Sequence, residues 1–164
     1  MTGSMEQLYQ QVILDHSRER HGAGGGGPDA PPASAESFQV NPTCGDEVRL
    51  RVHLREGATA PIIDRVTWDG TGCSISQASV SVLTDLVAGA DVATVDRVTE
   101  TFRALMNNRG QPLEDDREEI LGDAAAFVGV ARYPARIKCA LLGWMALRDA
   151  LAQAVTAPPQ AGER

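Results

Sequence analysis

The feature that most constrains the fold is a single change in the spacing of the apolar residues. Between residues 38 and 68 the period is two, and after residue 72 it is that of a helix. Residues 48–55 alternate aliphatic side chains with Arg49, Arg51, His53 and Arg55, so we expect a strand whose second face is solvated. Because the helices follow the strands without βαβ alternation, the pattern predicts an α+β domain.

Three strands are expected, at residues 38–40, 48–55 and 62–68, and their short links favour an antiparallel meander. One helix over residues 5–20 precedes them. Four helices follow the strands and would pack on the sheet, over residues 74–88, 92–105, 118–130 and 134–155. Residues 22–36 are rich in Gly and Pro and lack apolar periodicity, which predicts a flexible loop. We expect a single domain over residues 1–156 and a disordered tail over 157–164.

Charge and composition narrow the possible partners and compartment. The net charge of −7 argues against nucleic acid or an anionic membrane as the main partner. No apolar run approaches the roughly 18 residues of a membrane span, and the N-terminus does not have the pattern of a secretory signal. The expected compartment is the cytoplasm, where the three cysteines would be thiols.

Each cysteine has a position that suits a site. Cys44 lies in a Pro- and Gly-containing loop, and Asp46 follows it across Gly45, so one turn can aim both side chains at one point. Cys73 directly precedes a helix, whose free N–H groups and dipole stabilise a thiolate. On the last helix Cys139 lies about 160° from the stripe centred on Ile137, Trp144 and Val155, so we expect it outside the core.

Three thiolates and one carboxylate suit a tetrahedral Zn²⁺. Their net charge with the ion is about −2, and Arg136, beside Cys139 on the same helix, would offset part of it and favour thiolate. The residues alone leave two alternatives open, because a cytosolic cysteine is commonly a small buried hydrophobe and because thiolate sites also accept iron. We expect His16 and His53 to be ordinary surface residues rather than ligands.

Three segments carry a resemblance to a known family. NPTCGDEVRL, GTGCSISQASVSVLT and YPARIKCALLGWMAL resemble the cysteine motifs of SufU proteins, in the IscU/NifU-like iron–sulfur cluster assembly family, and LYQQVILDH resembles that family's first helix. The resemblance implies a compact α+β fold in which Cys44, Asp46, Cys73 and Cys139 bind one zinc ion. It also implies a sulfurtransferase in which Cys44 accepts persulfide sulfur from a SufS-type cysteine desulfurase and passes it to downstream SUF assembly components.

Two departures distinguish the chain from cluster scaffolds of the IscU type. Those scaffolds usually have a His before the third cysteine, where this chain has Lys138, and a chaperone-binding Leu-Pro-Pro-Val-Lys segment, where this chain has YPARIK. Both departures favour sulfur transfer. The alternatives are a scaffold that binds iron or an iron–sulfur cluster, and a purely structural zinc domain.

Overall fold

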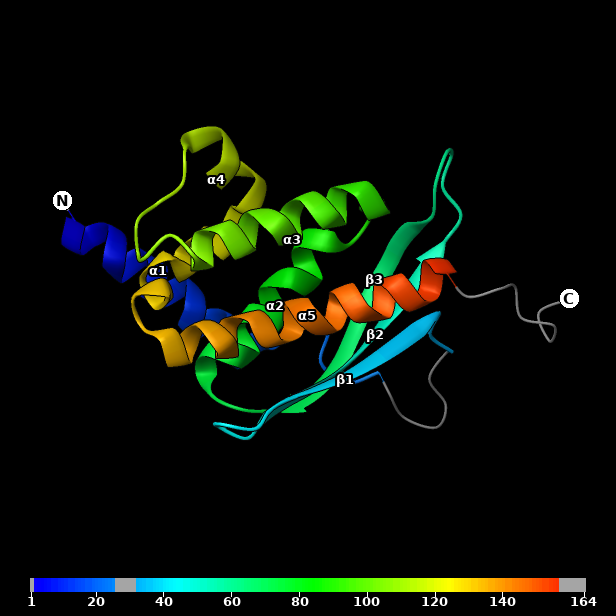
Figure 1. The fold of residues 1–164 in the computed structure, drawn as a ribbon, viewed down its shortest axis with the longest axis horizontal. Helices are drawn as coiled ribbons and strands as arrows, with labels where there is room; N and C mark the ends of the chain where they lie inside the picture. The colour runs from blue at the N-terminus through cyan, green and yellow to red at the C-terminus, as the bar shows by residue number, and fades with distance from the viewer. Residues whose placement is uncertain (1, 26–31, 157–164) are drawn as a thin grey trace, which may run out of the picture.

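The computed structural model describes residues 2–25 and 32–156, with side chains from residue 5 onward. It confirms the α+β class: an N-terminal helix, then a three-stranded sheet, then helices (Figure 1). The elements are α1 (Thr2–Glu19), β1 (Ala35–Asn41), β2 (Asp46–Arg55), β3 (Ile62–Thr71), α2 (Ser74–Val87), α3 (Val92–Met106), α4 (Asp115–Leu121), the 3₁₀ helix η1 (Gly122–Arg132) and α5 (Pro134–Thr156). Within the described residues, no helix has both the length and the apolarity that crossing a membrane requires.

The sheet is the predicted antiparallel meander, in the order β1–β2–β3. Asn41 pairs with Asp46 at the β1–β2 turn, and Leu50 pairs with Trp68 in the middle of β2 and β3. The alternating aliphatic residues of β2 are buried on one face, which α5 crosses in Figure 1. Burial of these side chains, at roughly 1.5–3 kcal/mol each, is the force that joins the sheet to the helices.

The second face of β2 is solvated only in part: Arg49 and Arg55 are exposed as expected, but the residues between them are buried. Arg51 and His53 are each only 7% exposed. The chain after α1 lies over Arg51: Ala23 pairs with Trp68 in β3, and the carbonyl oxygen of Gly24 accepts a hydrogen bond from Arg51. His53 contacts Thr67, and its pKa is lowered by burial and by the charges of Arg65 and Arg51, so it is neutral and buried rather than a surface residue.

The predicted loop over residues 22–36 is therefore shorter than expected. Residues 22–25 are held against β3 by hydrogen bonds of Gly22 and Gly24 to Trp68, and β1 already begins at Ala35. Residues 26–31 and the predicted tail, 157–164, lie outside the described residues. The predicted helix over 118–130 is instead α4 followed by η1, because the chain turns at Gly122, which has a φ of +52°.

Helix α5 packs more deeply than its predicted stripe suggests. Ile137 is only half-buried and Val155 is 46% exposed, whereas small residues such as Gly143 and Ala146 are buried. A Cβ atom on Gly143 would lie 2.5 Å from Val80 Cγ2, so the missing side chain lets α5 approach α2 closely. The expectation that Cys139 lies outside the buried face was wrong: it is 6% exposed.

Candidate metal centre

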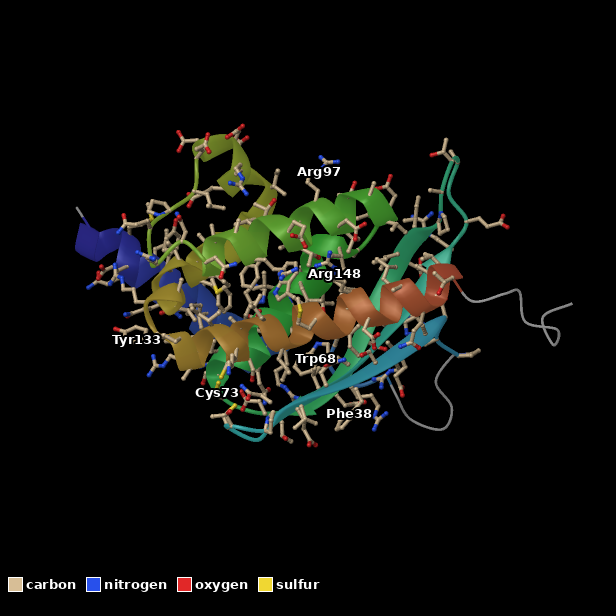
Figure 2. The ribbon with its side chains drawn as sticks, in the orientation of Figure 1. Phe38, Trp68, Cys73, Arg97, Tyr133 and Arg148 are labelled. Carbon is tan, nitrogen blue, oxygen red and sulfur yellow. The ribbon has the colours of Figure 1, made fainter. Side chains whose placement is uncertain are left out.

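The four predicted ligands come together at one end of the sheet. They come from the β1–β2 turn, the junction between β3 and α2, and the second turn of α5. Figure 2 shows Cys73 at this end, below the first turns of α5. Ligand atoms of Cys44, Asp46 and Cys139 lie within 4.8 Å of one another, and Cys73 contacts Asp46 directly.

The β1–β2 turn presents Cys44 and Asp46 differently. The turn is closed by the Gly45 amide, which donates to the Asn41 carbonyl at 2.8 Å, and the Asn41 side chain accepts from the Thr43 amide. Gly45 has a φ of +77°, a conformation that favours glycine. As a result Cys44 is exposed at the tip of the turn, and Asp46, the first residue of β2, is buried at 4% exposure.

Cys73 is the residue that caps the N-terminus of α2. Its own amide donates to Asp46 Oδ1 at 3.2 Å, and its Sγ lies 3.5 Å from Asp46 Oδ2. Gly72 makes this contact possible, because a Cβ atom there would lie 2.8 Å from both Cγ and Oδ1 of Asp46. The role of Gly72 was missed in the sequence, where only its position beside a cysteine marks it.

Cys139 forms the buried floor of the site. Its Sγ lies 3.8 Å from Cys44 Sγ and 3.6 Å from the carbonyl oxygen of Ala135 on the preceding helical turn. The four residues therefore form a half-open arrangement: Asp46 and Cys139 are buried, and Cys44 and Cys73 are exposed.

The protons of the metal-free site are distributed unequally. Burial raises the pKa of Cys139 far above its ordinary value, and the neighbouring Asp46 and Cys73 raise it further, so this thiol is protonated at neutral pH. Burial also acts to raise the pKa of Asp46, but hydrogen bonds from Cys139, Cys44 and the Cys73 amide outweigh it and hold that pKa below its usual range. Asp46 is thus ionised at neutral pH, and its carboxylate accepts hydrogen bonds from the surrounding cysteines.

The spacing of these donors fits zinc. A tetrahedral ion with Zn–S bonds of about 2.3 Å separates two sulfurs by about 3.8 Å, and a sulfur from a carboxylate oxygen by about 3.6 Å. The Cys44–Cys139 distance is 3.8 Å and the Cys73–Asp46 distance is 3.5 Å. These two pairs already have the separations that such an ion requires, and three thiols with one carboxylate are a donor set that fits the metal. Cys73 is not among the three residues whose ligand atoms all lie within 4.8 Å of one another.

Arg136 and His16, two other residues singled out in the sequence, are not at this centre. Arg136 is exposed, and its guanidinium carbon lies 5.2 Å from the centre of the Tyr133 ring. Among the described residues, the structure records no hydrogen bond or ion pair between Arg136 and the four ligands, so its electrostatic role stays a prediction. His16 is 5% exposed and contacts Ser81 and Asp123, which contradicts the expected surface role.

Comparison with known proteins places this arrangement in a family. The NifU-like N terminal domain matches residues 8–140. The chain is 36% identical to the zinc-dependent sulfurtransferase SufU of Bacillus subtilis strain 168, over 92% of this chain and 93% of that protein. It is 33% identical to the iron–sulfur cluster assembly scaffold protein IscU of Streptococcus pyogenes serotype M1, over 93% of this chain and 88% of that protein.

A solved structure agrees with these relatives. A putative iron–sulfur cluster assembly scaffold protein for the SUF system, from Fervidobacterium islandicum AW-1, superimposes with a TM-score of 0.68 at 29% identity. The match covers 88% of this chain and 97% of that one. With its helix–sheet–helix order and three cysteine segments, the chain belongs to the NifU-like N-terminal domain family, the family of the IscU and SufU iron–sulfur cluster assembly proteins.

Proposed function

We propose that this protein is a zinc-dependent sulfurtransferase in which Cys44 accepts sulfur from a cysteine desulfurase. The observation that carries the proposal is the unequal exposure of the ligands: the Cys44 thiol is exposed at the tip of a turn, while Asp46 and Cys139 hold the site from beneath. The relative from Bacillus subtilis, named a zinc-dependent sulfurtransferase, supports it.

A zinc ion held by the four residues would keep Cys44 deprotonated at neutral pH without burying it. The Cys44 thiolate then attacks the outer sulfur of a cysteine persulfide on the partner enzyme. A new S–S bond forms at Cys44, the S–S bond of the partner breaks, and the partner's cysteine leaves as a thiolate. No external oxidant or reductant is required, because one persulfide replaces another.

Cys44 is better suited to this step than the other two thiols. Cys73 is fixed at the start of α2, where its amide is hydrogen-bonded to Asp46. Cys139 lies within α5 and is buried, so moving its sulfur would require moving a packed helix. Cys44 lies on a turn that has open space at Gly45, so its sulfur can leave the other ligands at low energetic cost.

The expected partner is a SufS-type cysteine desulfurase, and the exposed rim of the site is where its persulfide would arrive. Arg136 lies on the first turn of α5, one turn before Cys139, and is exposed. We propose that it offsets part of the negative charge of the zinc-loaded site and so assists the approach of an anionic persulfide. Arg136→Gln should then slow sulfur transfer while leaving the zinc content unchanged.

A second candidate function is assembly of an iron–sulfur cluster on the same residues. The relative from Streptococcus pyogenes supports it, since it is named a scaffold and is nearly as similar as the sulfurtransferase. The residue before Cys139 is Lys138, which does not bind metals readily, whereas an imidazole there would supply another ligand. Zinc without acid-labile sulfide in the isolated protein would favour sulfur transfer, and a brown protein that contains sulfide would favour the scaffold.

The deciding experiment mixes the zinc-loaded protein with a cysteine desulfurase and free cysteine, and locates the added sulfur by mass spectrometry. We expect the persulfide on Cys44. Cys44→Ser should abolish stimulation of the desulfurase and keep the fold, because Cys44 is exposed on a turn. Persulfide found mainly on Cys73 or Cys139, or full stimulation by the Cys44→Ser protein, would refute the proposal.

Asp46→Ala tests the role of the carboxylate. The change removes one ligand and the hydrogen-bond acceptor for the Cys73 amide, so we expect weaker zinc binding and impaired sulfur acceptance. Elemental analysis after dialysis against a chelator measures the first effect, and desulfurase stimulation the second. Unchanged zinc retention together with unchanged stimulation would show that Asp46 is not a ligand.

A further inference from the structure

A second cluster of potential ligands lies away from the cysteines, where α1 ends against α2. It consists of His16 in the last turn of α1, His21 in the turn that follows, and Asp85 in the last turn of α2. Asp85 follows Ser74 by eleven residues, so it lies about 16 Å along the helix from the end that carries Cys73. The cluster therefore shares no ligand with the cysteine centre.

The ligand atoms of the three residues lie within 4.8 Å of one another. The two imidazole rings meet edge to face, with their centres 4.9 Å apart. His21 Nδ1 lies 2.6 Å from Asp85 Oδ2, and His21 Nε2 lies 2.8 Å from Glu19 Oε1.

His16 is the buried member of the cluster, with 5% exposure. Its Nδ1 lies 2.7 Å from Ser81 Oγ, and its Nε2 lies 3.1 Å from Asp123 Oδ2. Whichever of its nitrogens binds an ion, the other keeps an oxygen partner that orients the ring. Ligating histidines in proteins usually have such a partner.

The cluster is organised to hold positive charge. Both nitrogens of His21 lie within hydrogen-bond distance of a carboxylate oxygen, so negative charge faces the ring on both sides. Among the described residues, the ion pairs formed by Glu19, Asp85 and Asp123 are all with these two histidines, and none is with Lys or Arg. Three carboxylates thus surround two rings that carry at most two positive charges.

We propose that His16, His21 and Asp85 form a second metal site, which binds a divalent first-row transition ion in place of the proton between His21 and Asp85. Two imidazoles and one carboxylate are the donor set that Fe²⁺, Co²⁺ and Zn²⁺ share, and the site lacks the thiolates of the cysteine centre. Glu19 and Asp123 supply further negative charge beside it.

The ligands have room to adopt the required geometry. A tetrahedral ion separates a nitrogen and an oxygen ligand by about 3.4 Å, so Asp85 and His21 must move apart from their present 2.6 Å. The Asp85 side chain is 53% exposed and that of His21 is 36% exposed, so both can rotate while His16 stays fixed. The proposal does not depend on sulfur transfer at Cys44.

Cobalt tests the proposal, because its spectrum reports its ligands. The zinc-loaded full-length protein is titrated with Co²⁺ and followed by equilibrium dialysis and absorption. We expect one further Co²⁺ per chain, with weak visible bands but without the near-ultraviolet thiolate-to-cobalt band that replacement of zinc at the cysteines would produce. His21→Gln and Asp85→Asn should each weaken this binding at least about tenfold.

His53→Gln is the matched control, since His53 is the only other histidine in the chain and lies on the sheet. It should leave Co²⁺ affinity unchanged, and melting curves of the zinc-loaded variants check that each is folded. Absence of the additional Co²⁺, equal binding by wild type and both cluster variants, or an equal loss in His53→Gln would overturn the proposal.

Discussion

Gly72→Ala is expected to damage the metal centre without adding or removing a ligand. A Cβ atom at this position would lie 2.8 Å from Cγ and Oδ1 of Asp46 and 2.5 Å from Ser76 Oγ. Because non-bonded heavy atoms prefer about 3.5 Å, the carboxylate or the β3–α2 junction must move by roughly 0.7 Å. Binding constellations tolerate displacements of only about 0.5 Å.

We therefore expect zinc affinity to fall about 10–100-fold, the range seen when the support of a metal ligand is disturbed. This corresponds to about 1.4–2.8 kcal/mol of binding free energy. Gly72 does not have the positive φ that excludes other residues, so its backbone accepts alanine. The metal-free protein should then keep its melting temperature or lose little of it, since Gly→Ala also lowers the entropy of the unfolded chain.

Competition with a chromophoric zinc chelator measures the affinity, and thermal unfolding of the metal-free protein measures the stability. Gly129→Ala is the matched control, because a Cβ atom at Gly129 meets nothing within 4 Å. Wild-type zinc affinity in Gly72→Ala would refute the reasoning, and so would an equal loss in Gly129→Ala.

Three further predictions concern the protons of the site and the core beneath it. Zinc binding should release protons and become tighter as the pH rises, because burial keeps the Cys139 thiol protonated in the metal-free protein and the ion requires its thiolate. Calorimetry in buffers of different ionisation enthalpy measures the proton release, and a zinc affinity that does not depend on pH would contradict the prediction. Ser79→Ala should lower the free energy of unfolding by about 1–3 kcal/mol. The Ser79 hydroxyl lies 3.0 Å from the buried indole N–H of Trp144 and accepts its hydrogen bond, so the change leaves that N–H without a partner. Urea unfolding measures the loss, and Ser79→Thr should retain part of the stability. Phe102→Ala should lower the free energy of unfolding by about 3–5 kcal/mol, because the ring is fully buried and stacks on Trp144 with the ring centres 4.6 Å apart. A loss below about 1 kcal/mol would show that neighbouring side chains fill the space left by the ring.

The positions of the strands and of most helices could be read from the sequence. The period of two in β2 and the helical period after Gly72 gave the α+β class, which the structure and its relatives confirm. Pro134 marked the start of α5, and Gly45 marked a turn with positive φ. Such features are local, because each depends on the conformations that a few neighbouring residues allow.

The candidate metal centre was also predicted from the sequence, through residue type, position and family resemblance. Its geometry was not. The burial of Asp46 beside the exposed Cys44, and the open space that Gly72 leaves for the carboxylate, depend on how the β1–β2 turn meets the start of α2. Residues 44, 73 and 139 are far apart in the chain, and only packing of the sheet against α5 sets the distances between their sulfurs.

The wrong predictions about burial share one physical cause. Periodicity determines which side chains of an element point the same way, but not what covers them. Arg51 and His53 do share a face of β2, but both are buried, and Gly24 in the segment after α1 contacts Arg51. His16 was expected at the surface, yet the turn after α1 brings His21 beside it and α2 supplies Ser81 and Asp85. The sequence by itself thus determined most of the elements and the candidate ligand types, whereas tertiary packing decided which polar groups are buried and which of them lie together.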